Sequence, residues 1–169
     1  GVVQSIGLAW DTSGNLYVSS YSGDLVQKFD PTGLDLGTFI STNLLGPTNI
    51  WFDTTGDLLV SDYNGTAVKR FDSNGNYPSD FMSGLSQSEG VDYLPDGNIL
   101  IGNGATSSVK LFDASGNYIQ DFVASGAGNL LTPNAVVVRE IGNVSVSENE
   151  AVTDNFIQPS IGTLFEVQP

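Results

Sequence analysis

One short motif, Phe-Asp-x-x-Gly, recurs along the chain at a nearly constant spacing. It stands at residues 29–33, 71–75 and 112–116, so that successive copies are 42 and 41 residues apart. A second turn containing glycine precedes each copy, with its glycines at positions 14, 56 and 97, and it keeps the same two spacings. Self-similarity at a period of about 42 residues indicates a repeat protein.

The segments between these turns have the pattern of β-strands. Apolar residues alternate with more polar ones, which is the period-two signature of a pleated strand. No window carries a sustained apolar period of 3.6 residues, so no helix longer than about two turns is expected. Each repeat therefore predicts up to four short antiparallel strands, with Gly, Asp and Asn forming the turns. Phe29, Phe71 and Phe112 are predicted to occupy equivalent buried places.

Four antiparallel strands in about 42 residues match one blade of a β-propeller. The residues also resemble a family. The stretches GLAWDTSGNLYVSSYSGDLVQKFDPTG, NIWFDTTGDLLVSDYNGTAVKRFDSNG and GVDYLPDGNILIGNGATSSVKLFDASG resemble the NHL-repeat and SMP-30/gluconolactonase-like group of six-bladed propellers. The resemblance covers residues 5 to about 149 and implies an all-β propeller, but such blades carry unrelated activities.

We expect a single propeller or half-propeller domain over residues 1–169. Its blades are predicted at about 5–46, 47–87, 88–132 and 133–169. The fourth blade shows its first two strands and a possible third over 163–167. Residues 1–6 are predicted to close the ring as a strand beside 163–167, because terminal segments often complete the last blade of a propeller.

Three arrangements are open for this closure. One is a four-bladed ring within one chain, and another is an eight-bladed ring formed by a homodimer that exchanges a strand at each seam. The third is an open arc that is a fragment of a larger propeller. Chain ends are ordered when another segment holds them in place, so ordered ends would favour closure over an open arc. The resemblance to a six-bladed family favours the dimer over the small ring.

Composition excludes several function classes. Five Lys and Arg against 19 Asp and Glu give a net charge of −14, which argues against nucleic acid as a partner. The chain has no His and no Cys, so Ser-His-Asp and Cys-His triads and His-ligated zinc sites cannot form. No stretch approaches the ~18 apolar residues of a membrane span. The start without Met suggests a removed export signal, so a secreted or periplasmic location is expected.

Metal sites built from oxygen ligands remain possible. In the SMP-30-like enzymes, a Glu and one or more Asn or Asp at the channel mouth hold a divalent cation that polarises a lactone or ester. Alignment on the turn glycines places Ile6, Thr48, Glu89 and Asn134 at the corresponding positions. The resemblance thus implies Glu89 and Asn134 as ligands of Ca²⁺ or another divalent cation. Ca²⁺ takes about six to eight oxygens, and the alternative is that both side chains cap backbone groups or meet water.

The expected binding site is the channel mouth with two neighbouring residues. Its members are Thr48, Asn49, Glu89, Asp92 and Asn134. We expect a scaffold that binds a protein or small-molecule ligand, with no catalytic residue assigned. The alternative is a divalent-metal-dependent lactonase or esterase that uses Glu89 and Asn134, so enzymatic activity is less expected than binding.

The aromatic residues of the first strands are predicted to be structural. Trp10, Phe52 and Tyr93 stand at equivalent positions and are expected in the core between blades. Trp51, on the opposite side of its strand, is also expected to pack between blades. Tyr21 and Tyr63 follow the second strands and are expected to be exposed.

Overall fold

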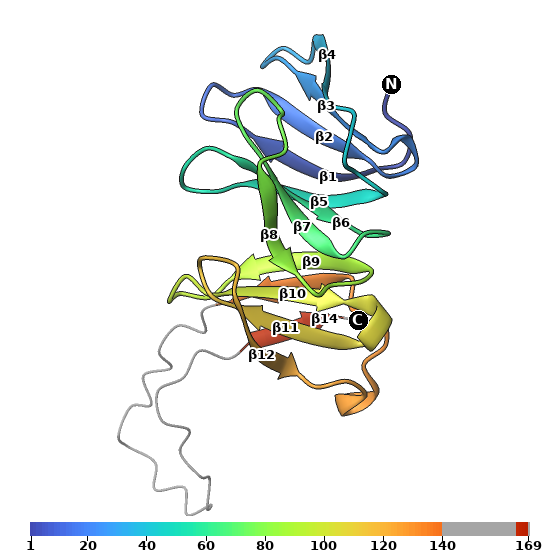
Figure 1. The fold of residues 1–169 in the computed structure, drawn as a ribbon, viewed down its shortest axis with the longest axis vertical. Helices are drawn as coiled ribbons and strands as arrows, with labels where there is room; N and C mark the ends of the chain where they lie inside the picture. The colour runs from blue at the N-terminus through green and yellow to red at the C-terminus, as the bar shows by residue number, and fades with distance from the viewer. Residues whose placement is uncertain (140–164, 169) are drawn as a thin grey trace, which may run out of the picture.

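The computed structural model describes residues 1–139 and 165–168 (Figure 1). These residues form three four-stranded antiparallel sheets and one two-stranded sheet. The helices of the described part are three-residue 3₁₀ turns, at Tyr21–Gly23, Gly104–Thr106 and Ala127–Asn129. The prediction of an all-β chain is confirmed for this part. None of its helices is long and apolar enough to span a membrane.

Each repeat of the sequence forms its own sheet, in chain order. The first sheet contains β1 (Ser5–Trp10), β2 (Leu16–Ser20), β3 (Leu25–Phe29) and β4 (Asp35–Ile40). The second contains β5 (Pro47–Phe52), β6 (Leu58–Asp62), β7 (Ala67–Phe71) and β8 (Ser79–Ser83). The third contains β9 (Ser88–Tyr93), β10 (Ile99–Asn103), β11 (Ser108–Phe112) and β12 (Tyr118–Val123). The fourth contains β13 (Ala135–Val138) and β14 (Phe165–Gln168).

The repeated Asp-containing segments are hairpin turns, as predicted. Oδ1 of Asp72 accepts hydrogen bonds from the backbone N–H groups of Asn74 and Asn76, each at 2.9 Å. Gly75 follows with φ +79, and a Cβ there would lie 2.5 Å from the carbonyl oxygen of Phe39. The turn therefore needs Gly both for its backbone conformation and for its close approach to the preceding sheet.

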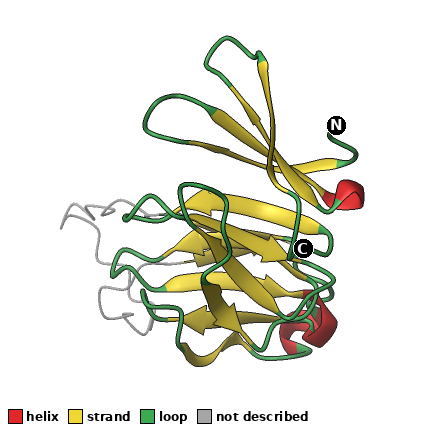
Figure 2. Cartoon of the chain, turned by 45° about the horizontal axis from the view of Figure 1, so that its top comes forward, coloured by secondary structure: helices red, strands yellow, loops and turns green. Residues whose placement is uncertain are grey.

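The sheets lie one after another in an arc, and their first strands are neighbours (Figures 1 and 2). A separate apolar core fills each of the three spaces between consecutive sheets. In the second sheet, Leu58 and Val60 are fully buried in the core shared with the first sheet. In the third sheet, Ile99 and Ile101 take the same places in the next core.

The predicted aromatic core is only partly confirmed. Phe71 and Phe112 are fully buried, but Phe29 is half-buried. The reason is that Phe71 and Phe112 pack in the cores facing the preceding sheets, whereas no sheet of the described residues covers that side of the first sheet. The prediction was wrong for Trp10 and Tyr93, which are 62% and 41% exposed.

Two other aromatic predictions have different outcomes. Trp51 packs against the core between the second and third sheets, as predicted. Tyr21 and Tyr63 are half-buried rather than exposed, because their rings meet edge to face at 5.8 Å across neighbouring sheets.

The described residues contain no pairing between the two ends of the chain. Ser5 and Ile6 belong to β1, and Ser5 lies opposite Ser20 of β2. β14 lies directly beside β13, the place of a second strand rather than the predicted third. No sheet of the described residues contains both 1–6 and 165–168. The predicted strand at 144–147 lies outside the described residues. Closure of the ring, within one chain or between two, stays a prediction.

Candidate functional site

Thr48, Asn49 and Glu89, three of the predicted channel-mouth residues, lie at a β-bulge of their sheet. Pairing of β5 with β6 shifts between Pro47 and Ile50, so Thr48 and Asn49 together oppose one residue, Ser61. The pairing of β1 shifts at the equivalent place, and that of β9 shifts beside Glu89. Bulges re-aim side chains and are frequent near functional sites.

Thr48 forms hydrogen bonds that connect neighbouring sheets. Its side chain is buried, and Oγ1 donates to the carbonyl oxygen of Ser88 at 3.1 Å. Its own carbonyl oxygen accepts a hydrogen bond from Oγ of Ser19 at 2.7 Å. Thr48 thus links the second sheet to both of its neighbours.

Asn49 and Asp92 make the same kind of link. Oδ1 of Asn49 accepts a hydrogen bond from the backbone N–H of Gly90 at 2.9 Å. Oδ2 of Asp92 accepts one from the backbone N–H of Val138 at 2.7 Å. Both side chains stabilise contacts between consecutive first strands, which limits their capacity to hold a ligand.

Glu89 is the predicted residue with unused binding capacity. Its side chain is half-buried, and burial raises the pKa of its carboxyl group. The described residues offer it no hydrogen bond or ion pair. Asn134 is exposed, directly before β13. No three His, Cys, Asp or Glu of residues 1–139 gather into a group that could hold a metal ion. The metal assignment of Glu89 and Asn134 stays a prediction.

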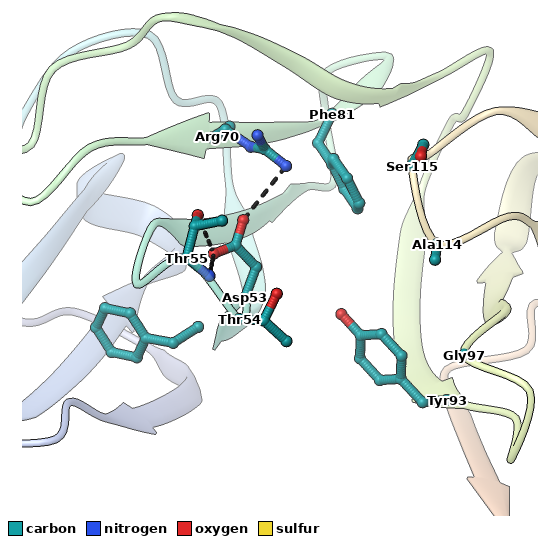
Figure 3. A pocket seen from close by; sticks show the side chains of 10 residues that line it. Asp53, Thr54, Thr55, Arg70, Phe81, Tyr93, Gly97, Ala114 and Ser115 are labelled. Carbon is teal, nitrogen blue, oxygen red and sulfur yellow. Dashed lines mark hydrogen bonds and ion pairs between the residues drawn. The ribbon is translucent and has the colours of Figure 1, made fainter.

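A groove of about 640 Å³ lies elsewhere, between the second and third sheets (Figure 3). Its lining residues come from the ends of first and third strands, from the turns that follow them, and from the fourth strand of the second sheet. They are Phe52, Asp53, Thr54, Thr55, Arg70, Phe81, Tyr93, Gly97, Ala114 and Ser115. Three aromatic rings, hydroxyl groups and one ion pair therefore converge on one concave surface, which is the usual composition of a binding site.

The ion pair forms one wall of the groove. Nη2 of Arg70 lies 3.3 Å from Oδ2 of Asp53, and the guanidinium carbon lies 4.9 Å from the centre of the Phe81 ring. Burial acts to raise the pKa of Asp53, but hydrogen bonds from Thr55 and Asp57 and the charge of Arg70 outweigh it and leave that pKa lowered. Asp53 is thus ionised at neutral pH and holds the guanidinium group of Arg70 over the ring.

Tyr93 forms the opposite wall. Its hydroxyl oxygen accepts a hydrogen bond from Nε1 of Trp51 at 2.7 Å, which leaves the hydroxyl hydrogen available to a ligand. Burial raises the pKa of Tyr93, so the group remains a neutral donor at physiological pH. The ring itself is 41% exposed.

A second hollow of about 310 Å³ adjoins the groove on the side of the first sheet. The two share the turn at residues 53–55, and the second hollow adds Trp10, Asp11 and Thr12. Each hollow thus combines an aromatic residue at the end of a first strand with an Asp-Thr pair from a turn. Together they make an extended groove across three sheets.

The sequence analysis missed this groove because it assigned these aromatic residues to the core. One signal could have found it. Trp10, Phe52 and Tyr93 each precede a turn, where a strand leaves the core, and two of them are followed directly by Asp-Thr.

No protein-family model matches the chain, and no curated protein matches it. Solved structures do match. The crystal structure of a nidogen/laminin complex contains a chain with a TM-score of 0.64 and 20% identity, and the match covers 80% of this chain and 52% of that one. A Bacteroides caccae protein of unknown function matches with a TM-score of 0.61 and 14% identity, and the match covers 76% of this chain and 53% of that protein. Virginiamycin B lyase from Staphylococcus aureus matches with a TM-score of 0.61 and 11% identity, and the match covers 79% of this chain and 45% of the lyase chain.

The matching chain of the nidogen/laminin complex and virginiamycin B lyase are β-propeller proteins. At such low identity, the likeness shows the fold alone. The described residues are all-β, with propeller-like four-stranded antiparallel sheets. The chain spans about half the length of the neighbours it matches.

Proposed function

We propose that this chain is a β-propeller binding module that holds an extended segment of a partner protein in the groove across its first three sheets. The observation that carries the proposal is the pair of walls in Figure 3, formed by Arg70 on Phe81 and by the exposed ring of Tyr93. Tyr, Trp and Arg are the residues that dominate binding energy in protein interfaces.

The shape of the groove favours a linear ligand. Its two hollows adjoin at the turn of residues 53–55, so a chain running from Trp10 to Tyr93 would meet one aromatic residue and one polar turn per sheet. Hydroxyl groups of Thr54 and Tyr93 would hydrogen-bond to peptide groups, and the rings would cover apolar side chains.

Charge limits the ligand to neutral or basic segments. The chain has a net charge of −14, and Asp11 and Asp53 lie in the groove. The positive charge of Arg70 is already paired with Asp53. A basic ligand would be attracted, and an acidic one repelled. The matching chain of the nidogen/laminin complex structure belongs to a protein assembly, which supports protein binding as the role of this fold here.

A peptide library displayed on phage and selected on the full chain would test the proposal. We expect the selected peptides to be neutral or basic and to bind Tyr93→Ala about tenfold more weakly, which corresponds to the ~1.4 kcal/mol typical of an interface aromatic residue. Tyr118→Ala is the matched control, because Tyr118 is 54% exposed and lies outside the groove. Peptides that bind both variants equally well would refute the groove as the site.

One observation favours a second candidate, a metal-dependent hydrolase. Glu89 is a half-buried carboxylic acid whose pKa is raised by burial, and acids with this property cluster at functional sites. Hydrolysis of a lactone that requires a divalent cation and Glu89 would establish this activity in place of simple binding.

A further inference from the structure

The space between the first and second sheets holds a tyrosine ring of the chain itself. Tyr17 of β2 packs in the core between these sheets and is 4% exposed. Its ring meets the rings of Phe39 and Phe52 edge to face, at 4.9 and 5.1 Å. Tyr17 is thus held by one aromatic residue from each of the two sheets.

A cation and a carboxylate complete the surroundings of this ring. Nζ of Lys28 lies 4.9 Å from the centre of the Tyr17 ring, and the hydroxyl group of Tyr17 donates a hydrogen bond to Oδ2 of Asp11 at 3.2 Å. A ring attracts a cation to its face, and a carboxylate is a strong acceptor. The first two sheets therefore show how this fold surrounds a phenol ring, with two aromatic rings, one cation and one carboxylate.

The second and third sheets repeat these surroundings with the residues that stand one repeat further along the chain. The four equivalents are Phe81 for Phe39, Tyr93 for Phe52, Arg70 for Lys28 and Asp53 for Asp11. All four line the groove of about 640 Å³ shown in Figure 3. The walls of the groove are therefore the same four groups that surround Tyr17.

The phenol ring itself is replaced in the second sheet. Leu59 stands at the position equivalent to Tyr17, and it is fully buried in the core. Its cross-strand partner is Trp51, where Tyr17 has Ala9. Trp51 packs against the same core as Leu59 and donates its hydrogen bond to Tyr93. Among the described residues, the lining of the groove includes neither Leu59 nor Trp51, so the space between its walls stays open.

Asp53 has an acceptor atom directed to this space. Its Oδ1 accepts three hydrogen bonds within its own turn, from the backbone and hydroxyl groups of Thr55 and the backbone of Asp57. Among the side-chain contacts of residues 1–139, Oδ2 has only the ion pair with Arg70, at 3.3 Å. Asp57 also replaces Asn15, whose side-chain amide donates to Asp11 in the first sheet. Oδ2 of Asp53 can therefore accept a hydrogen bond from a ligand.

We infer that the groove between the second and third sheets binds a tyrosine side chain of the partner segment. The ring lies between Phe81 and Tyr93, beside the guanidinium group of Arg70, and its hydroxyl group donates to Oδ2 of Asp53. This inference rests on the proposed function, and it names the residue that the bound segment must carry. Both sheets that form the groove lie within residues 47–123, all of which the structure describes.

Matched peptides test the inference on the unmodified chain. We expect the tightest peptides from the phage selection to contain Tyr. Replacing that Tyr by Phe should weaken binding about tenfold, because a hydrogen bond to a carboxylate is lost, and replacing it by Ala should weaken binding further. Peptides that depend on Tyr93 of the chain but contain no Tyr, or that tolerate its replacement by Ala, would overturn the inference and leave the proposed function standing.

A small probe separates the two proposals if the selection yields no peptide. N-acetyltyrosine amide should shift the NMR signals of Phe81 and Tyr93, and N-acetylleucine amide should not. Shifts without any bound peptide would refute the proposed function and support the phenol site. If neither a tyrosine peptide nor the amide binds, the inference is overturned.

A variant that fills the groove from within gives an independent test. Leu59→Tyr combined with Trp51→Ala copies the pair formed by Tyr17 and Ala9 in the first sheet. The added ring should weaken the binding of a tyrosine peptide at least about tenfold while the chain stays folded by circular dichroism. Ile119→Tyr is the matched control, because Ile119 is 47% exposed on β12 and lies outside the groove. Unchanged binding by the folded double variant would contradict the inference, and the peptide series decides if that variant fails to fold.

Discussion

Oδ1 of Asp62 accepts a hydrogen bond from the backbone N–H of Leu45 at 2.5 Å. Asn103 binds Ser86 in the same way at 2.7 Å, and Oγ of Ser20 binds Val3 at 2.7 Å. Each second strand thus ends in a buried polar side chain that anchors the backbone leading into its sheet. Three different residue types perform this task, because each offers an oxygen at the same place.

The charge of Asp62 makes its position sensitive to Lys69. Asp62 is fully buried, and Nζ of Lys69 lies 2.9 Å from its Oδ2. Lys69→Met should destabilise the chain by about 3–5 kcal/mol, since it leaves a buried carboxylate without its counter-charge. Urea unfolding followed by circular dichroism would measure this change.

A double variant is the control for that measurement. Asp62→Asn copies Asn103 of the third sheet, so Asp62→Asn combined with Lys69→Met should recover most of the lost stability. If the double variant is as unstable as Lys69→Met alone, the loss comes from packing of the Lys69 side chain rather than from the unpaired charge.

The three equivalent Phe residues should differ in their contribution to stability. Phe71→Ala and Phe112→Ala should each cost about 3–5 kcal/mol, because both rings are fully buried. Phe29→Ala should cost clearly less in the monomer, since Phe29 is half-buried. Thermal unfolding of the three variants at low protein concentration would compare them, and equal costs would contradict the difference in burial.

The fold was largely predictable because its signals are local and repeated. The turn glycines and the alternation of apolar residues predicted the twelve strands of the first three sheets, and the structure contains them. Burial was harder to predict at the end of the arc. Trp10 has the same local pattern as Phe52, but its exposure depends on whether a sheet precedes it, which no local pattern records.

The candidate site was less predictable for a related reason. The sequence correctly identified polar residues near the predicted channel mouth, namely Thr48, Asn49 and Asp92. Their side chains, however, already form hydrogen bonds to the backbone of neighbouring first strands, which limits their capacity to bind a ligand. Arg70 and Tyr93 line the same groove although they belong to different sheets. They are close only because the two sheets pack side by side. Sequence spacing identified equivalent residues, whereas Arg70 and Tyr93, on opposite walls of the groove, stand at positions that are not equivalent.

Acid should destabilise the chain through its turns. A hydrogen bond from the side chain of Asn76, followed by backbone hydrogen bonds, lowers the pKa of Asp72, and Asn117 does the same for Asp113. A lowered folded-state pKa contributes stability that is present above the unfolded value of about 3.9 and is lost as pH falls through the folded value. Melting temperatures should therefore fall below about pH 4, and less steeply in the variant with Asp72→Asn and Asp113→Asn. An identical pH profile for the variant would contradict this role of the two carboxylates.

Glu89 should have the opposite effect on stability. Burial raises its pKa above the ordinary value of 4.5, so between these two values the folded chain binds more protons than the unfolded one. Stability then decreases as pH rises through this window and stays reduced above the folded value. Glu89→Gln removes this cost, so its melting temperature relative to the unmodified chain should be higher at pH 7 than at pH 4. If Glu89 instead binds a divalent cation, Ca²⁺ should raise the melting temperature of the unmodified chain at pH 7 and leave that of Glu89→Gln unchanged. A relative melting temperature that does not change between pH 4 and pH 7 would contradict the raised pKa, whatever Ca²⁺ does.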